Sequence, residues 1–296
     1  MIAIRGGLGR VGVLAVTLAL SACAGDAIED EAYVERPVND LYNAALDELK
    51  EGNNTRAAAA FQEVERQHPY SQWATRGQLM AAYALYKAGE YDQAIDAARR
   101  FIDLHPGHKD VPYAHYLVGI SYYDQISDIG RDQKMTELAY QSFNELIRRF
   151  PDSDYGRDAK LKADLARDHL AGKEMEIGRY YQRQGKYVAA LNRFRTVVDQ
   201  YQTTSHIEEA LHRLTETYLA LGIREEAIKT AAVLGHNYPG SPWYQDSYAL
   251  LANDDALPTP RPGGGQGDDG GTRGTAAGSD QDGLTEPPTA ARTGPT

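Results

Sequence analysis

The chain has 296 residues, of which 42% are hydrophobic and 25% charged, so it is long enough to bury a sizeable core. Its net charge of −11 argues against binding to nucleic acid, because neutralising phosphates requires a basic patch and the sequence shows none. The single cysteine excludes an intramolecular disulfide and a metal centre built from several thiolates.

Residues 1–22 have the pattern of an export signal. Arg5 and Arg10 precede the apolar run 11–20, which is too short for a membrane-spanning helix of about 20 residues. Leu-Ser-Ala-Cys at residues 20–23 resembles the lipobox of bacterial lipoproteins. We therefore expect cleavage before Cys23, with diacylglycerol on its thiol and an N-acyl lipid on its new amino terminus. An ordinary signal peptide with a chance cysteine is the alternative.

The predicted lipidated tether covers residues 23–36, which are acidic and show no apolar periodicity. At about 3.5 Å per residue, residues 24–36 reach at most ~45 Å, so the folded part would work close to the membrane surface. Ala24, rather than aspartate, follows Cys23. By resemblance to enterobacterial sorting rules, this favours the outer membrane, with the folded part facing the periplasm.

A repeated spacing organises residues 37–252. From Gly89, a small residue follows at +5, an Ala or Phe at +9 and a larger apolar residue at +12, and Pro106 closes the unit. The same spacing starts at Gly52, at Gly185, at Gly222 and, with a longer loop in place of the turn glycine, at Lys134. Each unit therefore predicts a helix, a tight turn, a second helix and a stop.

These units resemble the tetratricopeptide (TPR) repeat. We expect five of them, at about 38–70, 72–107, 111–152, 156–203 and 206–240, followed by a cap helix near 242–251. A single helical pair cannot cover its own apolar face, so neighbouring pairs must stack. The expected fold is all-α, a superhelical solenoid of five TPR-like hairpins between a disordered N-terminal tether and a disordered C-terminal tail.

The middle of the array is less regular than its ends. Residues 158–173 continue a helical pattern toward Tyr181, and Gly172 and Gly178 are expected to break or bend this helix. We expect the irregular stretch to divide the array into an N-terminal pair and a C-terminal pair of units. Residues 253–296 are rich in Gly, Pro, Asp and Thr, cannot bury enough apolar surface to order themselves, and are predicted to be disordered.

No pattern of catalytic or metal-binding residues appears. His105 and His108 come closest to a ligand pair, but two imidazoles without further ligands hold zinc poorly. The acidic pair Glu208-Glu209 lies at a helix start, where capping and the helix dipole explain it. We therefore expect no enzyme, no cofactor other than the covalent lipid, and no metal site.

Stacked helical hairpins leave a concave groove lined by their first helices, which suits an extended peptide. The aromatic candidates for peptide binding are Tyr42, Tyr70, Trp73, Tyr83 and Tyr86. Packing between units is the alternative role, above all for Tyr83 and Tyr86. Tyr70 and Trp73 lie in the turn PYSQW between units and are the better candidates, for a strand segment that ends in aromatic residues.

Taken together, these features resemble the YfiO/ComL-like TPR lipoproteins of the outer-membrane β-barrel assembly (Bam) machinery, the BamD family. The resemblance covers roughly residues 20–240 and is carried by the lipobox, the acidic tether and the motifs HPYSQW, DIGRDQ and RRFPDSDY. It implies a scaffold for protein insertion into the outer membrane. The C-terminal repeats would dock onto a POTRA domain of the barrel subunit, and the N-terminal repeats would receive unfolded outer-membrane proteins. Other assembly lipoproteins would be further partners.

Two departures from that family stand out. The fourth unit ends in YQTTSH instead of a proline turn, and Glu208 stands where family members carry an arginine that contacts the barrel subunit.

Two other functions are alternatives for a helical solenoid of this kind. A periplasmic TPR coordinator of envelope division or peptidoglycan processing would usually carry an N-terminal coiled coil, but no heptads precede Pro37. A peptidoglycan-lytic enzyme would need a catalytic glutamate in a folded domain beyond the repeats, where only the predicted tail lies.

Overall fold

The computed structural model describes residues 35–252, which form α-helices and no strand. The predicted signal peptide, Cys23, most of the tether and the predicted tail lie outside this range. The eleven helices of the described range are α1 Val38–Lys50, α2 Asn54–Gln67, α3 Gln72–Lys87, α4 Tyr91–Leu104, α5 Val111–Tyr123, α6 Lys134–Arg149, α7 Asp154–Arg183, α8 Tyr187–Gln200, α9 Ile207–Ala220, α10 Arg224–Asn237 and α11 Pro242–Ala252.

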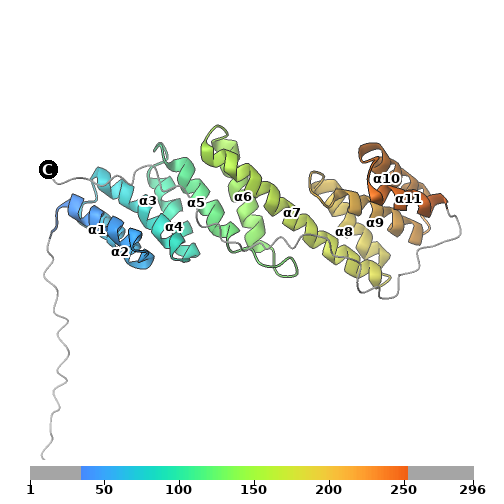
Figure 1. Ribbon diagram of the computed structural model, residues 1–296, viewed down its shortest axis with the longest axis horizontal. Coiled ribbons are helices and arrows are strands. Elements are labelled where there is room, and N and C mark those ends of the chain that lie inside the picture. The colour runs from blue at the N-terminus through green and yellow to red at the C-terminus, as the bar shows by residue number, and fades with distance from the viewer. Residues whose placement is uncertain (1–34, 253–296) are drawn as a thin grey trace, which may run out of the picture. The chain divides into compact units, whose positions relative to one another are not determined.

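Consecutive helices pack as antiparallel pairs that follow one another in chain order (Figure 1). The first helix of one pair also packs against the first helix of the next pair, from α1 to α3, from α3 to α5 and from α5 to α7. The final helix, α11, packs on α9 and α10 and covers the end of the array. The expected all-α solenoid of TPR-like hairpins is confirmed.

In four of the five pairs, the turn between the two helices depends on a left-handed glycine. At Gly89, φ is +78°, a conformation in which a side chain would be strained. Its N–H donates to the Tyr86 carbonyl (2.9 Å), and the next N–H, of Glu90, donates to the Leu85 carbonyl (3.0 Å). These two bonds form a Schellman motif, which satisfies the last carbonyls of α3 and turns the chain back into α4.

The second helix of each pair ends on a residue whose backbone lies outside the helical region. His105, which precedes Pro106, has φ −131° and ψ 52°, because a residue before proline is pushed out of the helical region. Tyr201 adopts similar angles, φ −123° and ψ 38°, although Gln202 follows it instead of proline. There Thr204 donates its hydroxyl to the Tyr201 carbonyl (2.8 Å) and holds the turn. The missing proline therefore does not lengthen α8.

The repeated apolar positions form the interior of the array. The small residue of each unit is Ala57, Ala94, Ala139, Ala190 or Ala227, and each of these is 0% exposed. Phe143 and Phe194, at the next repeated position, press their rings against Gly119 and Gly178 on the preceding helix. A Cβ at either glycine would overlap the ring, so these glycines let the two helices of a pair approach closely.

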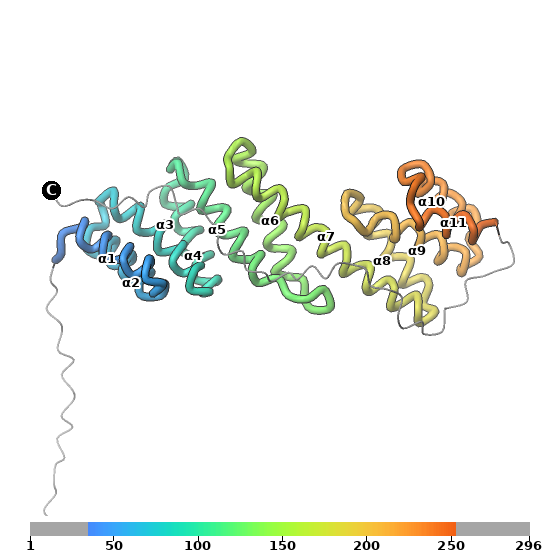
Figure 2. Tube along the Cα trace, in the orientation of Figure 1, coloured from blue at the N-terminus to red at the C-terminus, as the bar shows by residue number. Residues whose placement is uncertain are grey.

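The longest helix, α7, is continuous through both of its glycines, so the expected break at Gly172 or Gly178 is wrong (Figure 2). Gly178 leaves room for the Phe194 ring, and Gly172 leaves room for Ile129 and His206. Both glycines therefore make room for the side chains that pack beside α7, and they do not break the helix. A helix carries such a residue at a cost of roughly 1 kcal/mol relative to alanine.

The apolar core is interrupted inside α7. One cluster of buried residues runs from Leu41 to Ala163, and the next begins at Ala171. Between them, α7 is held by polar side chains: Arg167 donates to the Gln200 carbonyl (2.6 Å), and Asp168 accepts from the Ser205 N–H (2.8 Å). We call residues 164–170 the polar seam. The first core includes the third helical pair, so the expected division into two units and two units is wrong.

Candidate peptide-binding surface

An N-terminal aromatic cluster joins the first two helical pairs. Tyr42 on α1 lies against Phe61 on α2 (ring centroids 5.4 Å) and Trp73 on α3 (4.9 Å). The Tyr42 ring is 0% exposed, and burial raises its pKa to about 12 despite the nearby Arg76. Tyr42 therefore packs between helices, and its ring is not available at the surface.

Tyr70 lies in the turn between the first two pairs, and Trp73 lies in the first turn of α3. Pro69 ends the preceding segment, and the Ser71 hydroxyl accepts a hydrogen bond from the Ala74 N–H (3.0 Å), which caps the start of α3. Tyr70 is fully exposed, and Trp73 is half-buried against Tyr42 with the Arg76 guanidinium 5.0 Å from its ring. The peptide-binding role of Tyr70 and Trp73 stays a prediction.

Tyr83 and Tyr86 are buried, and the structure places both with inter-helix packing rather than with an open groove. The Tyr86 hydroxyl donates to Asp124 (2.5 Å), which follows α5. Burial raises the pKa of Tyr86 well above its usual value, and the neighbouring Asp124 carboxyl raises it further. Helical spacing alone could not separate these two roles, because both place tyrosine on the same side of the helix.

A second tyrosine–carboxylate contact lies one pair further along, and no sequence pattern predicted it. The Tyr116 hydroxyl on α5 donates to Asp158 on α7 (2.6 Å), just as Tyr86 on α3 donates to Asp124. These hydrogen bonds join successive first helices. Their partners are separated by 38 and 42 residues, so no local motif marks them.

A charged network occupies the corresponding position at the C-terminal end. Arg179 on α7 donates to Glu209 on α9 (2.9 Å), and Arg213 donates to both Glu209 (3.2 Å) and Glu216 (2.8 Å). Burial raises the pKa of Glu216, but hydrogen bonds from His212 and Arg213 and their charges bring it down to about 2. We call these residues the C-terminal network. Glu208, which stands where the family pattern has an arginine, lies half-buried in the first turn of α9.

The C-terminal network continues onto the cap helix. His212 lies 3.5 Å from Glu216, and its Nδ1 shares a hydrogen bond with Ser247 on α11 (2.9 Å). The Trp243 ring lies 5.1 Å from the His212 ring and 5.6 Å from the Arg213 guanidinium. The network therefore ties α7, α9 and α11 together through long side chains.

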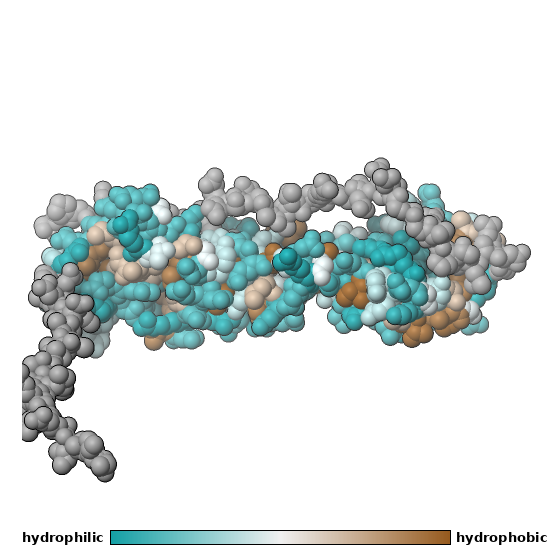
Figure 3. Space-filling view, turned by 90° about the horizontal axis from the view of Figure 1, so that it is seen from below, coloured by the Kyte–Doolittle hydropathy of each residue, from teal (hydrophilic) through white to brown (hydrophobic). Residues whose placement is uncertain are grey.

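Exposed apolar side chains are concentrated toward the C-terminal half. Of the ten large hydrophobic residues exposed in the described range, two lie before α7, namely Tyr70 and Leu104. The other eight are Leu161, Leu165, Tyr180, Val188, Ile223, Ile228, Val233 and Tyr248. Figure 3 shows a mainly hydrophilic face with separate apolar patches, some of them toward the end that carries α8 to α11.

Among the described residues, no cluster of three or more metal-ligating side chains occurs, and no helix is both long and apolar enough to cross a membrane. The ring nitrogen of His105 shares a hydrogen bond with Gln78 (2.7 Å), and the His105 and His108 ring centroids are 6.5 Å apart.

Three comparisons with known proteins extend this description. A family model described as YfiO, outer membrane lipoprotein, matches residues 34–234. The outer membrane protein assembly factor BamD of Caulobacter vibrioides is 47% identical over 248 residues, which cover 83% of this chain and 81% of that protein. BamD of Rickettsia prowazekii is 43% identical over 241 residues, which cover 81% of this chain and 95% of that protein. A thermophilic TPR protein of Thermus thermophilus superposes with a TM-score of 0.34 at 16% identity, over 73% of this chain and 99% of that one.

Proposed function

This chain belongs to the YfiO family of outer membrane lipoproteins, and we propose that it is a scaffold in the assembly of β-barrel proteins into the outer membrane. The observation that carries the proposal is the similarity to BamD proteins along most of the chain. A solenoid of helical hairpins offers extended binding surface, so we propose binding rather than catalysis as its activity.

Attachment to the membrane would occur through lipid on Cys23. Several acyl chains, at about 0.8 kcal/mol per buried CH₂, make such attachment effectively permanent. The folded helices would then face the periplasm on their tether. Replacement of Cys23 by alanine should release the protein from the membrane fraction, and continued sedimentation with membranes would contradict the lipid anchor.

The C-terminal repeats are proposed to bind the POTRA domain of the barrel subunit. Support comes from the concentration of exposed apolar side chains on α7 to α11, since such patches mark protein interaction sites. Val188 lines an open hollow of about 570 Å³ between the start of α8 and Leu221 at the end of α9. Ile223, in the next turn, is also exposed.

A charge placed in this patch tests the docking proposal. Val188→Asp combined with Ile223→Asp should remove copurification of the barrel subunit, because each aspartate would have to be buried unpaired in the interface. Leu104→Asp is the matched control, since Leu104 is exposed (53%) but lies on α4. Equal loss in the control, or no loss in the double variant, would contradict a C-terminal docking surface.

The N-terminal repeats are proposed to receive unfolded outer-membrane proteins through Tyr70 and Trp73. Tyr70→Ala with Trp73→Ala should weaken crosslinking to peptides that end in aromatic residues, while the barrel subunit still copurifies. If both partners are lost together, the two ends of the array do not have separate roles.

Affinity purification from detergent-solubilised envelopes tests the whole proposal. We expect the main copurifying proteins to be an integral outer-membrane barrel with periplasmic domains and further assembly lipoproteins. Recovery of division proteins or peptidoglycan enzymes instead would favour the alternative, a periplasmic TPR coordinator of envelope division or peptidoglycan processing.

A further inference from the structure

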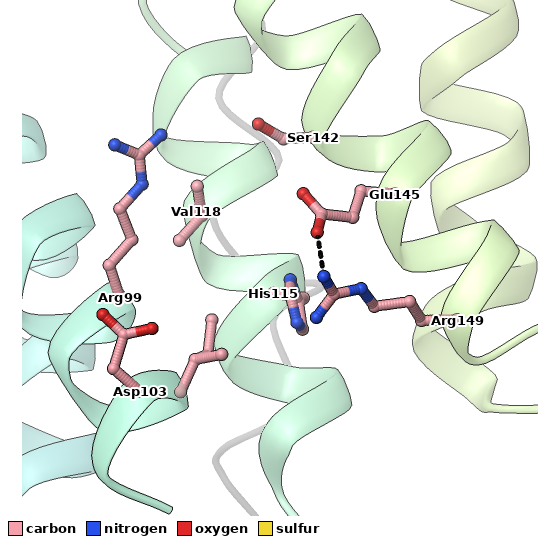
Figure 4. A pocket seen from close by; sticks show the side chains of 8 residues that line it. Arg99, Asp103, His115, Val118, Ser142, Glu145 and Arg149 are labelled. Atoms are coloured by element: carbon pink, nitrogen blue, oxygen red, sulfur yellow. Dashed lines mark ion pairs between the residues drawn. The ribbon is translucent and has the colours of Figure 1, made fainter. Parts of the chain in front are cut away.

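A half-enclosed cavity lies between α4, α5 and α6 (Figure 4) and belongs to none of the surfaces described above. Its volume is about 320 Å³, enough for one medium-sized side chain. Ile102 and Val118 supply apolar wall, and the remaining lining is almost entirely polar or charged. A cavity of this composition can hold a group that is apolar along its stem and charged at its tip.

His115 on α5 lines the cavity and carries an unsatisfied hydrogen-bonding group in its wall. The residue is 8% exposed, and its Nε2 atom is buried without a hydrogen-bond partner among the described residues. Its ring lies 5.7 Å from that of Phe150. A buried polar nitrogen without a partner costs roughly 1–3 kcal/mol, so such atoms usually have a ligand or water to bond. Burial lowers the pKa of His115, and the neutral ring can donate one N–H.

Of the two guanidiniums that line the cavity, one forms an ion pair and the other, that of Arg99, forms none among the described residues. Glu145 and Arg149 on α6 neutralise each other at 2.8 Å, as the dashed line in Figure 4 marks. Arg99 on α4 donates to the Tyr122 hydroxyl (3.1 Å) and has no ion-pair partner among the described residues. Its planar fork of N–H groups matches the two oxygens of a carboxylate.

We propose that this cavity binds a peptide carboxylate, in the first place a glutamate side chain of a partner protein. The methylene stem would lie on Ile102 and Val118, and the carboxylate oxygens would accept hydrogen bonds from Arg99 and from the His115 Nε2–H. Asp103, one turn after Arg99 on α4, also lines the cavity and would repel this ligand. The site goes beyond the proposed function, because it adds a third recognition surface away from both ends of the array.

The test uses the whole chain with ¹⁵N-labelled histidine, and the probe is the blocked peptide acetyl-Gly-Gly-Glu-Gly-Gly-amide. The sequence has eight histidines, so the His115 signal is assigned by its loss in His115→Gln. We expect the glutamate peptide to shift the His115 ring resonances and the matched glutamine peptide to leave them unchanged. A peptide with no glutamate and a free terminal carboxylate tests the second source of the same group. A response to either peptide supports carboxylate binding, and the stronger response identifies the source.

Three variants distinguish specific binding in this cavity from a nonspecific effect of charge on the protein surface. Arg99→Gln should weaken binding about tenfold, the loss expected for one charge-assisted hydrogen bond. Arg100→Gln is the matched control, because Arg100 is the next residue on α4 but pairs with Glu65 (2.6 Å) outside the cavity lining. Asp103→Asn should tighten binding by removing a like charge.

Three results would overturn the proposal. One is that no His115 resonance moves with up to about 10 mM of either carboxylate peptide. Another is that Arg100→Gln weakens binding as much as Arg99→Gln. The third is that Asp103→Asn weakens binding, because removing a like charge beside a bound carboxylate must strengthen its binding.

Discussion

Replacement of Glu216 by glutamine should destabilise the C-terminal part of the array. Glu216 accepts hydrogen bonds from Arg213 (2.8 Å) and Gln182 (3.1 Å), and His212 lies 3.5 Å away. The side chain is only 15% exposed, so water screens these interactions weakly. Glutamine keeps the shape of the side chain but removes the charge that pairs with Arg213 and His212 on α9 and that accepts the hydrogen bond from Gln182 on α7.

The size of the effect follows from the pKa of Glu216. That pKa is lowered from 4.5 to about 2, and each unit corresponds to about 1.4 kcal/mol, so the charged form contributes on the order of 3 kcal/mol. Because the pKa of the folded state is the lower one, this contribution is fully present above pH 4.5 and is lost as the pH falls toward 2. At about 2–4 °C per kcal/mol, the melting midpoint at neutral pH should fall by roughly 6–12 °C.

Thermal unfolding followed by circular dichroism, with amide hydrogen exchange on α9, measures the loss. The matched control is Glu226→Gln, which removes the same charge from an exposed pair with Lys229 (2.6 Å) on α10. Exposed pairs contribute about 0–1 kcal/mol, so this variant should melt close to the wild type. If both variants melt alike at pH 7, or if the Glu216→Gln difference persists unchanged at pH 2, the reasoning is wrong.

The remaining predictions concern packing, a buried carboxyl and the C-terminal segment. Gly178→Ala should cost roughly 1–3 kcal/mol, because its Cβ would overlap the Phe194 ring; Gly107→Ala, in open space, should cost little in the same denaturant titration. Tyr86→Phe should cost about 1 kcal/mol. It should also raise the pKa of Asp124 further, since the lost hydrogen bond favours the charged carboxylate; an unchanged titration of Asp124 by NMR would refute this. Removal of residues 253–296 should leave the melting midpoint unchanged, and a clear fall would show that the segment stabilises the helices.

The hairpins were predictable because each depends on short-range chemistry. A glycine at Gly89 permits the left-handed turn, Pro106 stops the second helix, and Ala94 lets the helices approach; all three can be recognised within 18 residues of sequence. The fourth unit lacks one of these three local signals, the proline that stops the second helix. Gln202 replaces the proline, yet the helix still ends at Gln200 because Thr204 holds the turn.

The parts that sequence could not supply depend on distant residues. Tyrosine is a residue type that peptide-binding grooves use, so Tyr42, Tyr83 and Tyr86 were candidates from sequence. Only the packing of neighbouring helices shows that these three side chains are buried. A glycine inside a helical pattern predicted a bend in α7 at Gly172. The residues that pack against Gly172, Ile129 and His206, lie more than 30 residues away in sequence, so the local pattern could not show this contact. Contacts of this kind leave no periodic pattern, so neither the C-terminal network nor the His115 cavity could be read from the sequence.

The polar seam has a consequence for how the two ends of the array are oriented. Among the described residues, neither apolar core extends across it, and α7 carries the chain from one core into the other. Each residue of an α-helix advances the chain by 1.5 Å and rotates it by about 100°. Insertion of a single residue in the polar seam would therefore rotate the helices after it by about 100° about the α7 axis, while the packing inside each of the two cores stays the same. The number of residues in the polar seam thus determines the angle, about the α7 axis, between the N-terminal and the C-terminal helices of the array.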